Sequence, residues 1–236
     1  MSRSWRSAVV MAQDYVRSAC ARRARPSQCR RLVSLIMVQI QPGLAGNPDT
    51  LRWNARYGAG FTPSFDSHPL AARALAAGPP VGSVLELASG PSGSALLAAS
   101  AGRAVTAVDA SDVGLRLLAA EAQRRGLADL LTLLHADLVT WRPEEASFAL
   151  VICTGYWDRE LFGPAACAVT DGGLIAWEAL TAAATRLRPT IPAQWCVGPG
   201  EPARLLPAGF EIIDFRDVGE AHTRRQLIAR SRRSRG

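Results

Sequence analysis

A chain of 236 residues, 48% of them apolar, has room for one domain with a substantial core. No apolar run approaches the roughly 18 residues that would cross a bilayer, which excludes a transmembrane helix. The net charge of +7 lies at the ends: residues 1–36 hold eight arginines and one acidic residue, residues 223–236 hold six arginines, and residues 37–222 hold 13 arginines against 19 acidic residues. Charge at chain ends is typical of solvated tails, so a nucleic-acid-binding protein is not favoured.

Cysteine and histidine positions indicate neither a metal centre nor a disulfide framework. The five cysteines are odd in number and contain no C-x-x-C pair, and the three histidines stand far apart at positions 68, 135 and 222. Neither pattern has the spacing of metal ligands. Reduced thiols are typical of the cytoplasm, so we expect a cytoplasmic protein without a bound metal.

Residues 1–48 differ from the rest of the chain and are predicted to be a basic N-terminal extension. Arg30 and Arg31 precede the mostly apolar residues 32–40, an order found in secretion signals, but the small-residue cleavage pattern is poor. A disordered arm, or a translation start wrongly placed upstream of Met37, is favoured over a targeting peptide. The folded domain is predicted to span residues 49–236.

From residue 49 onward, short apolar runs alternate with segments of helical periodicity. Strands are predicted at 83–87, 104–109, 131–135, 147–153, 173–178, 210–217 and 224–230. Helices are predicted at 51–57, 68–77, 92–101, 112–125, 159–168 and 200–206. This alternation predicts an α/β fold, a doubly wound and mostly parallel seven-stranded sheet with helices on both faces. The last two strands have no helix between them, which predicts a C-terminal antiparallel hairpin.

Acidic residues stand at the ends of the first three predicted strands. Glu86 and Asp109 end the first and second strands, and Asp137 follows the third. The carboxyl ends of neighbouring parallel strands share one edge, where open α/β sheets bind ligands, so we expect the three carboxylates to surround a small-molecule site. Single acids at strand ends are often helix caps or solvated turn residues, an alternative that their combination with a glycine turn makes less favourable.

That glycine turn follows the first strand and reads Ala-Ser-Gly-Pro-Ser-Gly over residues 88–93. Gly90 would let the backbone pass close to a ligand, and the helix that follows favours an anion there, either a pyrophosphate or an amino-acid carboxylate. A carboxylate at Glu86 favours a ligand with an ammonium group over a pyrophosphate. Asp109 suits a ribose diol and Asp137 an adenine amine, so the set predicts a site for S-adenosylmethionine (SAM).

The same residues resemble the motifs of the class I SAM-dependent methyltransferases. Segment 86–92 is similar to the first motif of that family, Asp/Glu-x-Gly-x-Gly-x-Gly, with Ala88 and Ser92 in two of the glycine positions. Asp109 and segment 135–138 resemble the second and third motifs, and the match covers about residues 50–230. Within the class, segments 53–57, 172–178 and 198–201 resemble the tellurite-resistance and thiopurine-methyltransferase-like branch.

The resemblance implies SAM as the cofactor and assigns residues to it. Glu86 would lie near the ammonium group and Asp109 on the ribose hydroxyls, while Tyr57 would close a helical lid. The remaining residues that the resemblance places around the cofactor are Ala88, Gly90, Ala136, Asp137, Leu138, Cys153 and Thr154.

The methyl acceptor is predicted to be a small molecule with a thiol, an oxyanion or a similar nucleophile. Transfer from a sulfonium is an in-line displacement that needs orientation above all, so a dedicated base is optional. The candidate catalytic residues on the acceptor side are Tyr156, Arg159 and Glu178, with Trp157, Arg188 and Trp195 as further candidates. Core or lid packing is the alternative for the two tryptophans and a surface charge for Arg159. His135 is predicted to be structural.

Two other function classes are weighed against this enzyme. A nicotinamide-dependent oxidoreductase would lack an acid at Glu86 and would need a proton relay such as Tyr-x-x-x-Lys, but the chain contains no lysine. A non-catalytic cofactor- or RNA-binding protein would use the arginine-rich ends and would bind RNA in a salt-sensitive manner. The favoured prediction is a methyltransferase with a small-molecule acceptor, without nucleic acid or membrane as a partner.

Overall fold

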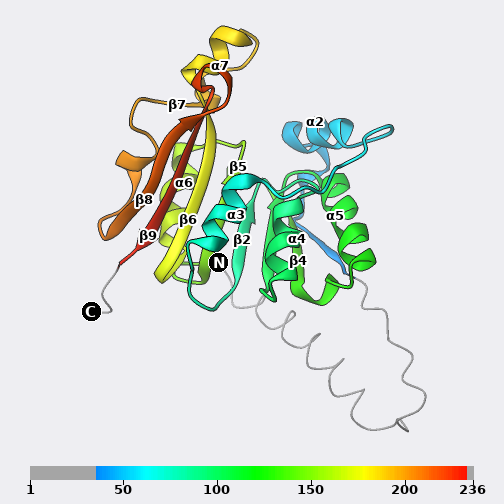
Figure 1. The fold of residues 1–236 in the computed structure, drawn as a ribbon. Helices are drawn as coiled ribbons and strands as arrows, with labels where there is room; N and C mark the ends of the chain where they lie inside the picture. The colour runs from blue at the N-terminus through cyan, green and yellow to red at the C-terminus, as the bar shows by residue number, and fades with distance from the viewer. Residues whose placement is uncertain (1–35, 233–236) are drawn as a thin grey trace, which may run out of the picture. The chain divides into compact units, whose positions relative to one another are not determined.

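The computed structural model describes residues 36–232, which fold around one mixed sheet of nine strands (Figure 1). Eight strands follow the order β1-β4-β3-β2-β5-β6-β9-β8, and β7 pairs with β6. The strands are β1 (Val38–Ile40), β2 (Val84–Leu87), β3 (Val105–Asp109), β4 (Leu131–His135), β5 (Phe148–Thr154), β6 (Val169–Thr181), β7 (Cys196–Val197), β8 (Phe210–Val218) and β9 (Arg224–Ser231). Only the β6–β9 and β9–β8 pairs are antiparallel, which confirms the mostly parallel sheet with a C-terminal antiparallel hairpin.

Six helices connect the strands or precede them within residues 36–232. They are α2 (Pro48–Arg56), α3 (Pro69–Ala76), α4 (Gly93–Ser100), α5 (Asp112–Arg124), α6 (Arg159–Cys167) and α7 (Ala182–Leu187). The predicted helix at 200–206 is wrong, because only a short 3-10 turn forms there, at Ala203–Leu205. Helix α7 and the short strands β1 and β7 were not predicted.

The start of the folded domain also differs from the prediction. Strand β1 lies in the segment assigned to the N-terminal extension, yet it pairs in parallel with β4, and Ile36 packs against the core. Residues 36–48 therefore belong to the folded domain. The predicted arm or mis-called start at residues 1–35 lies outside the described residues.

The C-terminal arginines Arg224, Arg225 and Arg230 are part of the sheet and not of a solvated tail. Arg225 of β9 forms an ion pair with Asp217 of β8, and Arg230 donates to the carbonyl oxygens of Ala77 and Gly172. The sequence pattern predicted the strand here but not the structural use of its charges.

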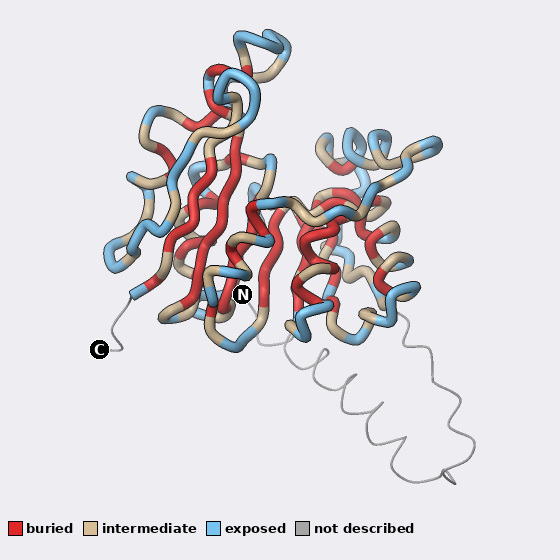
Figure 2. The backbone as a smooth tube through the Cα atoms, in the orientation of Figure 1, coloured by how far each residue is buried: buried red, intermediate tan, exposed pale blue. Residues whose placement is uncertain are grey.

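The two faces of the sheet have separate apolar cores. One core packs α3, α4 and α5 against side chains such as Leu133 and Ile152, and the other packs α6 against neighbours such as Val151 and Trp177. The central strands are buried along their length (Figure 2), as expected for parallel strands covered on both sides. No helix within residues 36–232 has the length and apolar character needed to cross a membrane.

Helix α2 and the segment after it lie across the edge where β2, β3 and β4 end (Figure 1). The segment is fastened to the start of α4, where Ser94 Oγ accepts a hydrogen bond from His68 N at 3.0 Å. Gly93 permits this close approach, since a Cβ atom there would collide with the carbonyl oxygen of Asp66. Gly93 thus makes room for the chain crossing it, and not for a ligand.

Candidate functional site

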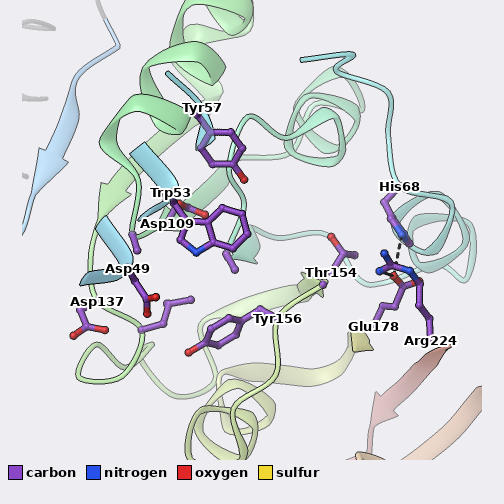
Figure 3. A pocket seen from close by; sticks show the side chains of 14 residues that line it. Asp49, Trp53, Tyr57, His68, Asp109, Asp137, Thr154, Tyr156, Glu178 and Arg224 are labelled. Carbon is purple, nitrogen blue, oxygen red and sulfur yellow. Dashed lines mark hydrogen bonds and ion pairs between the residues drawn. The ribbon is translucent and has the colours of Figure 1, made fainter. Parts of the chain in front are cut away.

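A cavity of about 510 Å³ opens at the carboxyl edge of the sheet, a size within the range of small-molecule sites (Figure 3). Its walls come from α2, from the ends of β2 to β6 and from the start of β9. The lining residues are Asp49, Trp53, Tyr57, His68, Ala88, Asp109, Ala110, Asp137, Leu138, Thr154, Gly155, Tyr156, Glu178 and Arg224.

The turn after β2 forms part of the cavity wall, whereas the carboxylate of Glu86 in β2 lies behind that wall. Ala88 lines the cavity with a left-handed backbone, φ 50°, whereas Glu86 is 2% exposed and is not among the lining residues. Ser92 Oγ donates to Glu86 Oε1 at 2.7 Å and caps the N-terminus of α4. Burial raises the pKa of Glu86 to about 7, although the Ser92 hydrogen bond opposes this rise.

Asp109, at the end of β3, lines the cavity and binds the backbone of the turn at residues 88–93. Its Oδ2 accepts from Gly90 N at 2.7 Å and its Oδ1 accepts from Ser111 N at 2.7 Å. Burial raises the pKa of Asp109 to about 6, while these two hydrogen bonds act in the opposite direction. Each oxygen keeps a lone pair, so the carboxylate can still accept hydrogen bonds from hydroxyl groups in the cavity.

Asp137 ties the cavity to helix α2. Its Oδ1 accepts from Val139 N at 2.9 Å, and its Oδ2 accepts from Asn47 Nδ2 at 3.2 Å. Asn47 is also the N-cap of α2, since its Oδ1 accepts from Asp49 N at 2.9 Å and from Thr50 N at 3.2 Å. One asparagine thus holds both the helix and the acidic side chain.

Tyr57, directly after α2, packs over the glycine turn. A Cβ atom at Gly90 would lie 2.7 Å from the Tyr57 hydroxyl oxygen, and one at Gly114 would lie 3.0 Å from the ring. Trp53 stacks on Tyr57 with ring centroids 5.8 Å apart. Glycine at both positions therefore lets an aromatic wall lie directly on the backbone. Burial raises the pKa of Tyr57 to about 12, so its hydroxyl stays protonated at neutral pH.

Glu178, Arg224 and His68 form the end of the cavity away from Asp137 (Figure 3). Glu178 is 1% exposed and accepts from Arg224 Nη1 at 2.8 Å and from Gln226 Nε2 at 2.5 Å, with His68 Nε2 at 3.4 Å. Burial alone would raise the pKa of Glu178, but the hydrogen bonds from His68 and Gln226 and the charge of Arg224 outweigh it and lower that pKa to about 2. Glu178 is an anion that cannot serve as a general base near neutral pH.

His68 is likewise unsuited to act as a base. Its Nδ1 accepts a hydrogen bond from Leu70 N at 3.1 Å, as the N-cap of α3. The neutral ring then carries its proton on Nε2, which faces Glu178. Both nitrogens are engaged, so His68 acts as a hydrogen-bond donor to the carboxylate.

Comparison with known proteins agrees with this geometry. Residues 84–171 match the family model described as a methyltransferase domain. The matched segment is similar to that family over less than half of the chain. It contains β2, the glycine turn, Asp109 and Asp137, which are the parts that build the floor of the cavity.

Several solved structures of methyltransferases have a fold similar to that of this chain. The CcbJ methyltransferase from Streptomyces caelestis is 16% identical, with a TM-score of 0.57 over 75% of this chain and 96% of that one. Magnesium protoporphyrin IX methyltransferase from Synechocystis PCC 6803, solved with bound S-adenosylhomocysteine (SAH), is 17% identical, with a TM-score of 0.56 over 76% and 92%. TehB from Haemophilus influenzae is 15% identical, with a TM-score of 0.58 over 78% and 67%. No curated protein sequence matches the chain.

Several residues that were predicted to bind the cofactor line the cavity, and others lie behind its wall. The lining residues are Tyr57, Ala88, Asp109, Asp137, Leu138 and Thr154. Gly90 lies under Tyr57, and Glu86, Ala136 and Cys153 are buried behind the surface. Burial raises the pKa of the Cys153 thiol well above its usual value, so this group is inert packing.

Of the residues predicted to contact the acceptor, some line the cavity and others lie outside it. Tyr156 and Glu178 line the cavity. Arg159 lies outside it, in a neighbouring pocket, and forms a two-hydrogen-bond ion pair with Glu201 at 2.9 and 3.0 Å. Trp157 is 5% exposed and packs with its ring centroid 5.7 Å from that of Phe162, as the packing alternative predicts, and it also lines the neighbouring pocket.

The other residues singled out on the acceptor side lie away from the main cavity. Trp195 lies in the neighbouring pocket under the guanidinium of Arg52, and Arg188 is an exposed residue at the end of α7. His135 is buried, and its Nε2 donates to the carbonyl oxygen of Ala110 at 3.0 Å, as expected for a structural residue.

The structure also adds lining residues that were not assigned to the site. They are Asp49, Trp53, His68, Ala110, Gly155 and Arg224. The signal for the first two was present, since Asp49, Trp53 and Tyr57 follow one another at intervals of four and so share one side of a helix. No comparable signal marked Arg224, which is one of six arginines in the last 14 residues.

Proposed function

We propose that this protein is a SAM-dependent methyltransferase that acts on a small molecule. The observation that carries the proposal is the meeting of Asp109 and Asp137 in one cavity beside the Ala88 turn, within a segment that matches a methyltransferase domain. The donor set fits the cofactor: carboxylate acceptors suit ribose hydroxyls and an exocyclic amine, and Glu86 Oε2 is buried without a hydrogen-bond partner among residues 36–232.

The roles follow the chemistry of each side chain. Asp109 would accept hydrogen bonds from ribose hydroxyls, Asp137 would accept one from the adenine amine, and Leu138 would pack on the base. Glu86 would favour the ammonium group from behind the turn, through its charge or through a water molecule. Tyr57 and Trp53 would cover the cofactor from α2.

The bound cofactor supplies an electrophilic methyl group on a sulfonium. The protein orients the two reactants and excludes water, since an in-line displacement gains most from positioning. Tyr156 lines the cavity with its hydroxyl protonated, because burial raises its pKa above the ordinary value, far from neutrality. Among the described residues that line the cavity, neither His68 nor Glu178 is available as a base, so the acceptor would bring its own nucleophile, such as a thiolate or an oxyanion.

The finer assignments are part of the same proposal. The motifs at 53–57, 172–178 and 198–201 support a place in the tellurite-resistance and thiopurine-methyltransferase-like branch, and the fold of TehB is compatible with it. A small-molecule acceptor is supported by the name of the magnesium protoporphyrin IX methyltransferase. Free thiols at Cys153 and Cys196 support a cytoplasmic location.

The proposal is tested by calorimetric titration of the purified protein with SAM, SAH, NAD and NADP in separate experiments. We expect saturable binding of SAM and SAH and none of the two nicotinamide cofactors. Binding of NAD or NADP without SAH would support the rival oxidoreductase. RNA retention that is lost at high salt, without binding of any of the four ligands, would favour the non-catalytic alternative.

A further inference from the structure

The cavity has an acidic end and an end that carries a guanidinium. Asp49, Asp109 and Asp137 lie at one end, and Arg224 lies at the other, beyond Thr154 (Figure 3). If the proposed function holds, the acidic end is taken up by the cofactor. The guanidinium end then faces the methyl acceptor.

Glu178 does not cancel the binding capacity of Arg224, because its carboxylate charge is shared among several donors. The carboxylate is buried and accepts from Arg224, Gln226 and His68. The guanidinium of Arg73 is linked to Glu178 through Gln226, since Arg73 Nη2 donates to Gln226 Oε1 at 2.6 Å. Three donors thus share the charge of the carboxylate, although among the described residues Oε2 accepts only from Gln226 and keeps a lone pair.

Arg224 has donors to spare. Its guanidinium carries five N–H bonds, and within residues 36–232 its side chain makes one hydrogen bond, from Nη1 to Glu178. The side chain is 41% exposed and lines the cavity. A planar guanidinium with free N–H groups is suited to two-point recognition of a carboxylate or a phosphate.

The sheet fixes where this guanidinium lies. Arg224 begins β9 and pairs with Leu180 of β6, and Gln226 pairs directly with Glu178 two residues along the same strand. Residues i and i+2 of a strand point to the same face, so Arg224 and Gln226 approach Glu178 from one side. The group is therefore held on paired strands and not on a loop, as a specificity-determining residue requires.

We infer that Arg224 selects a methyl acceptor that carries an anionic group, a carboxylate or a phosphate ester, and holds that group at the end of the cavity away from Asp137. This inference rests on the proposed function. Glu178 keeps the guanidinium in place by a charge-assisted hydrogen bond. The rest of the acceptor would extend toward Thr154 and Tyr156, which line the wall between the two ends.

The test uses benzoate and benzamide as an anionic and a neutral probe of the same shape, titrated into the SAH-saturated protein. We expect the wild-type protein to bind benzoate at least tenfold more tightly than benzamide. Arg224→Gln should lose this preference, and Arg224→Lys should keep part of it. The matched control is Arg216→Gln, which removes the same charge from an exposed site on neighbouring β8.

The affinity for SAH separates this inference from the proposed function. We expect the SAH dissociation constant of Arg224→Gln to stay within about twofold of the wild-type value, well below a tenfold change. Equal binding of both probes by the wild-type protein, or equal benzoate affinity in Arg224→Gln, contradicts the inference. A large loss of SAH affinity in this variant also contradicts it, because Arg224 would then serve the cofactor. If the wild-type protein binds no SAH, the proposed function fails, and with it the role of Arg224 toward a methyl acceptor. The benzoate titration of the free protein then shows whether Arg224 binds an anionic group.

Discussion

Ala88 occupies a backbone conformation that favours glycine. Its φ of 50° places it in the left-handed region, where a Cβ atom costs on the order of 1 kcal/mol. We therefore predict that Ala88→Gly raises the free energy of unfolding by about 1 kcal/mol, measured by urea denaturation.

Two other alanines serve as controls for this substitution. Ala146 has φ 47° in an exposed turn away from the cavity, so Ala146→Gly should give a similar gain. Ala110 lines the cavity but is not among the residues with positive φ, so Ala110→Gly should give no gain. If Ala88→Gly changes the free energy of unfolding no more favourably than Ala110→Gly does, backbone strain at Ala88 is contradicted.

At the same scale, the sequence could predict which residues gather at the site but not which of them face the ligand. The strand-end positions of Asp109 and Asp137 follow from the apolar runs, and both carboxylates line the cavity. Glu86 has an equivalent position in sequence, but Ser92 turns back from the start of α4 and binds its carboxylate. That contact depends on a cap geometry which spacing along the chain does not define.

Helix α2 depends on one asparagine for its place over the cavity. Asn47 caps the helix and also donates to Asp137, so we predict that Asn47→Ala lowers the free energy of unfolding by about 1 kcal/mol and weakens SAH binding severalfold. Chemical denaturation and calorimetry measure the two effects separately.

Asn47→Ser separates the cap from the link to Asp137. Serine caps a helix as well as asparagine does, but it has no amide group to donate to Asp137. This variant should keep most of the stability and still weaken SAH binding. Wild-type affinity in both variants would show that the position of α2 does not matter for the cofactor.

The elements that could be predicted are those with a strong apolar period. The strands β2, β3, β4, β5 and β6 could be predicted because buried parallel strands need apolar runs, whereas the antiparallel strands β8 and β9 have shorter apolar segments between charged residues. Strands β1 and β7 have three and two residues, too few to show any period, and exist only through their pairing with β4 and β6. Their formation is decided by the neighbouring strand and not by their own residues.

Over the whole molecule, buried carboxyl groups at the site should make stability depend on pH. Glu86 has a folded-state pKa of about 7 against an ordinary value of 4.5, so the folded state keeps a proton that the unfolded state loses. Stability is then full below about pH 4.5 and falls as the pH rises through 7, with Asp109 acting in the same direction. For Glu86 alone, the free energy of unfolding falls by about 3 kcal/mol over this pH range.

Glu178 has the opposite effect at lower pH. Its pKa is lowered to about 2, so the stability it contributes is present above pH 4.5 and is lost as the pH falls toward 2. We predict a maximum of the melting temperature near pH 4 to 5 for the ligand-free protein, with Glu86→Gln flattening the decline on the alkaline side. An equal decline between pH 5 and 8 in the wild-type and Glu86→Gln proteins would contradict the assignment of this effect to Glu86.

The central claim is that one cavity at the carboxyl edge of the sheet holds an adenosyl group, and a crystal structure of the protein with SAH tests it most directly. We predict ribose hydroxyls within hydrogen-bonding distance of Asp109, the adenine amine beside Asp137, and the ring packed on Leu138. An adenosyl group bound elsewhere, or in this cavity with its ribose away from Asp109, would contradict the account.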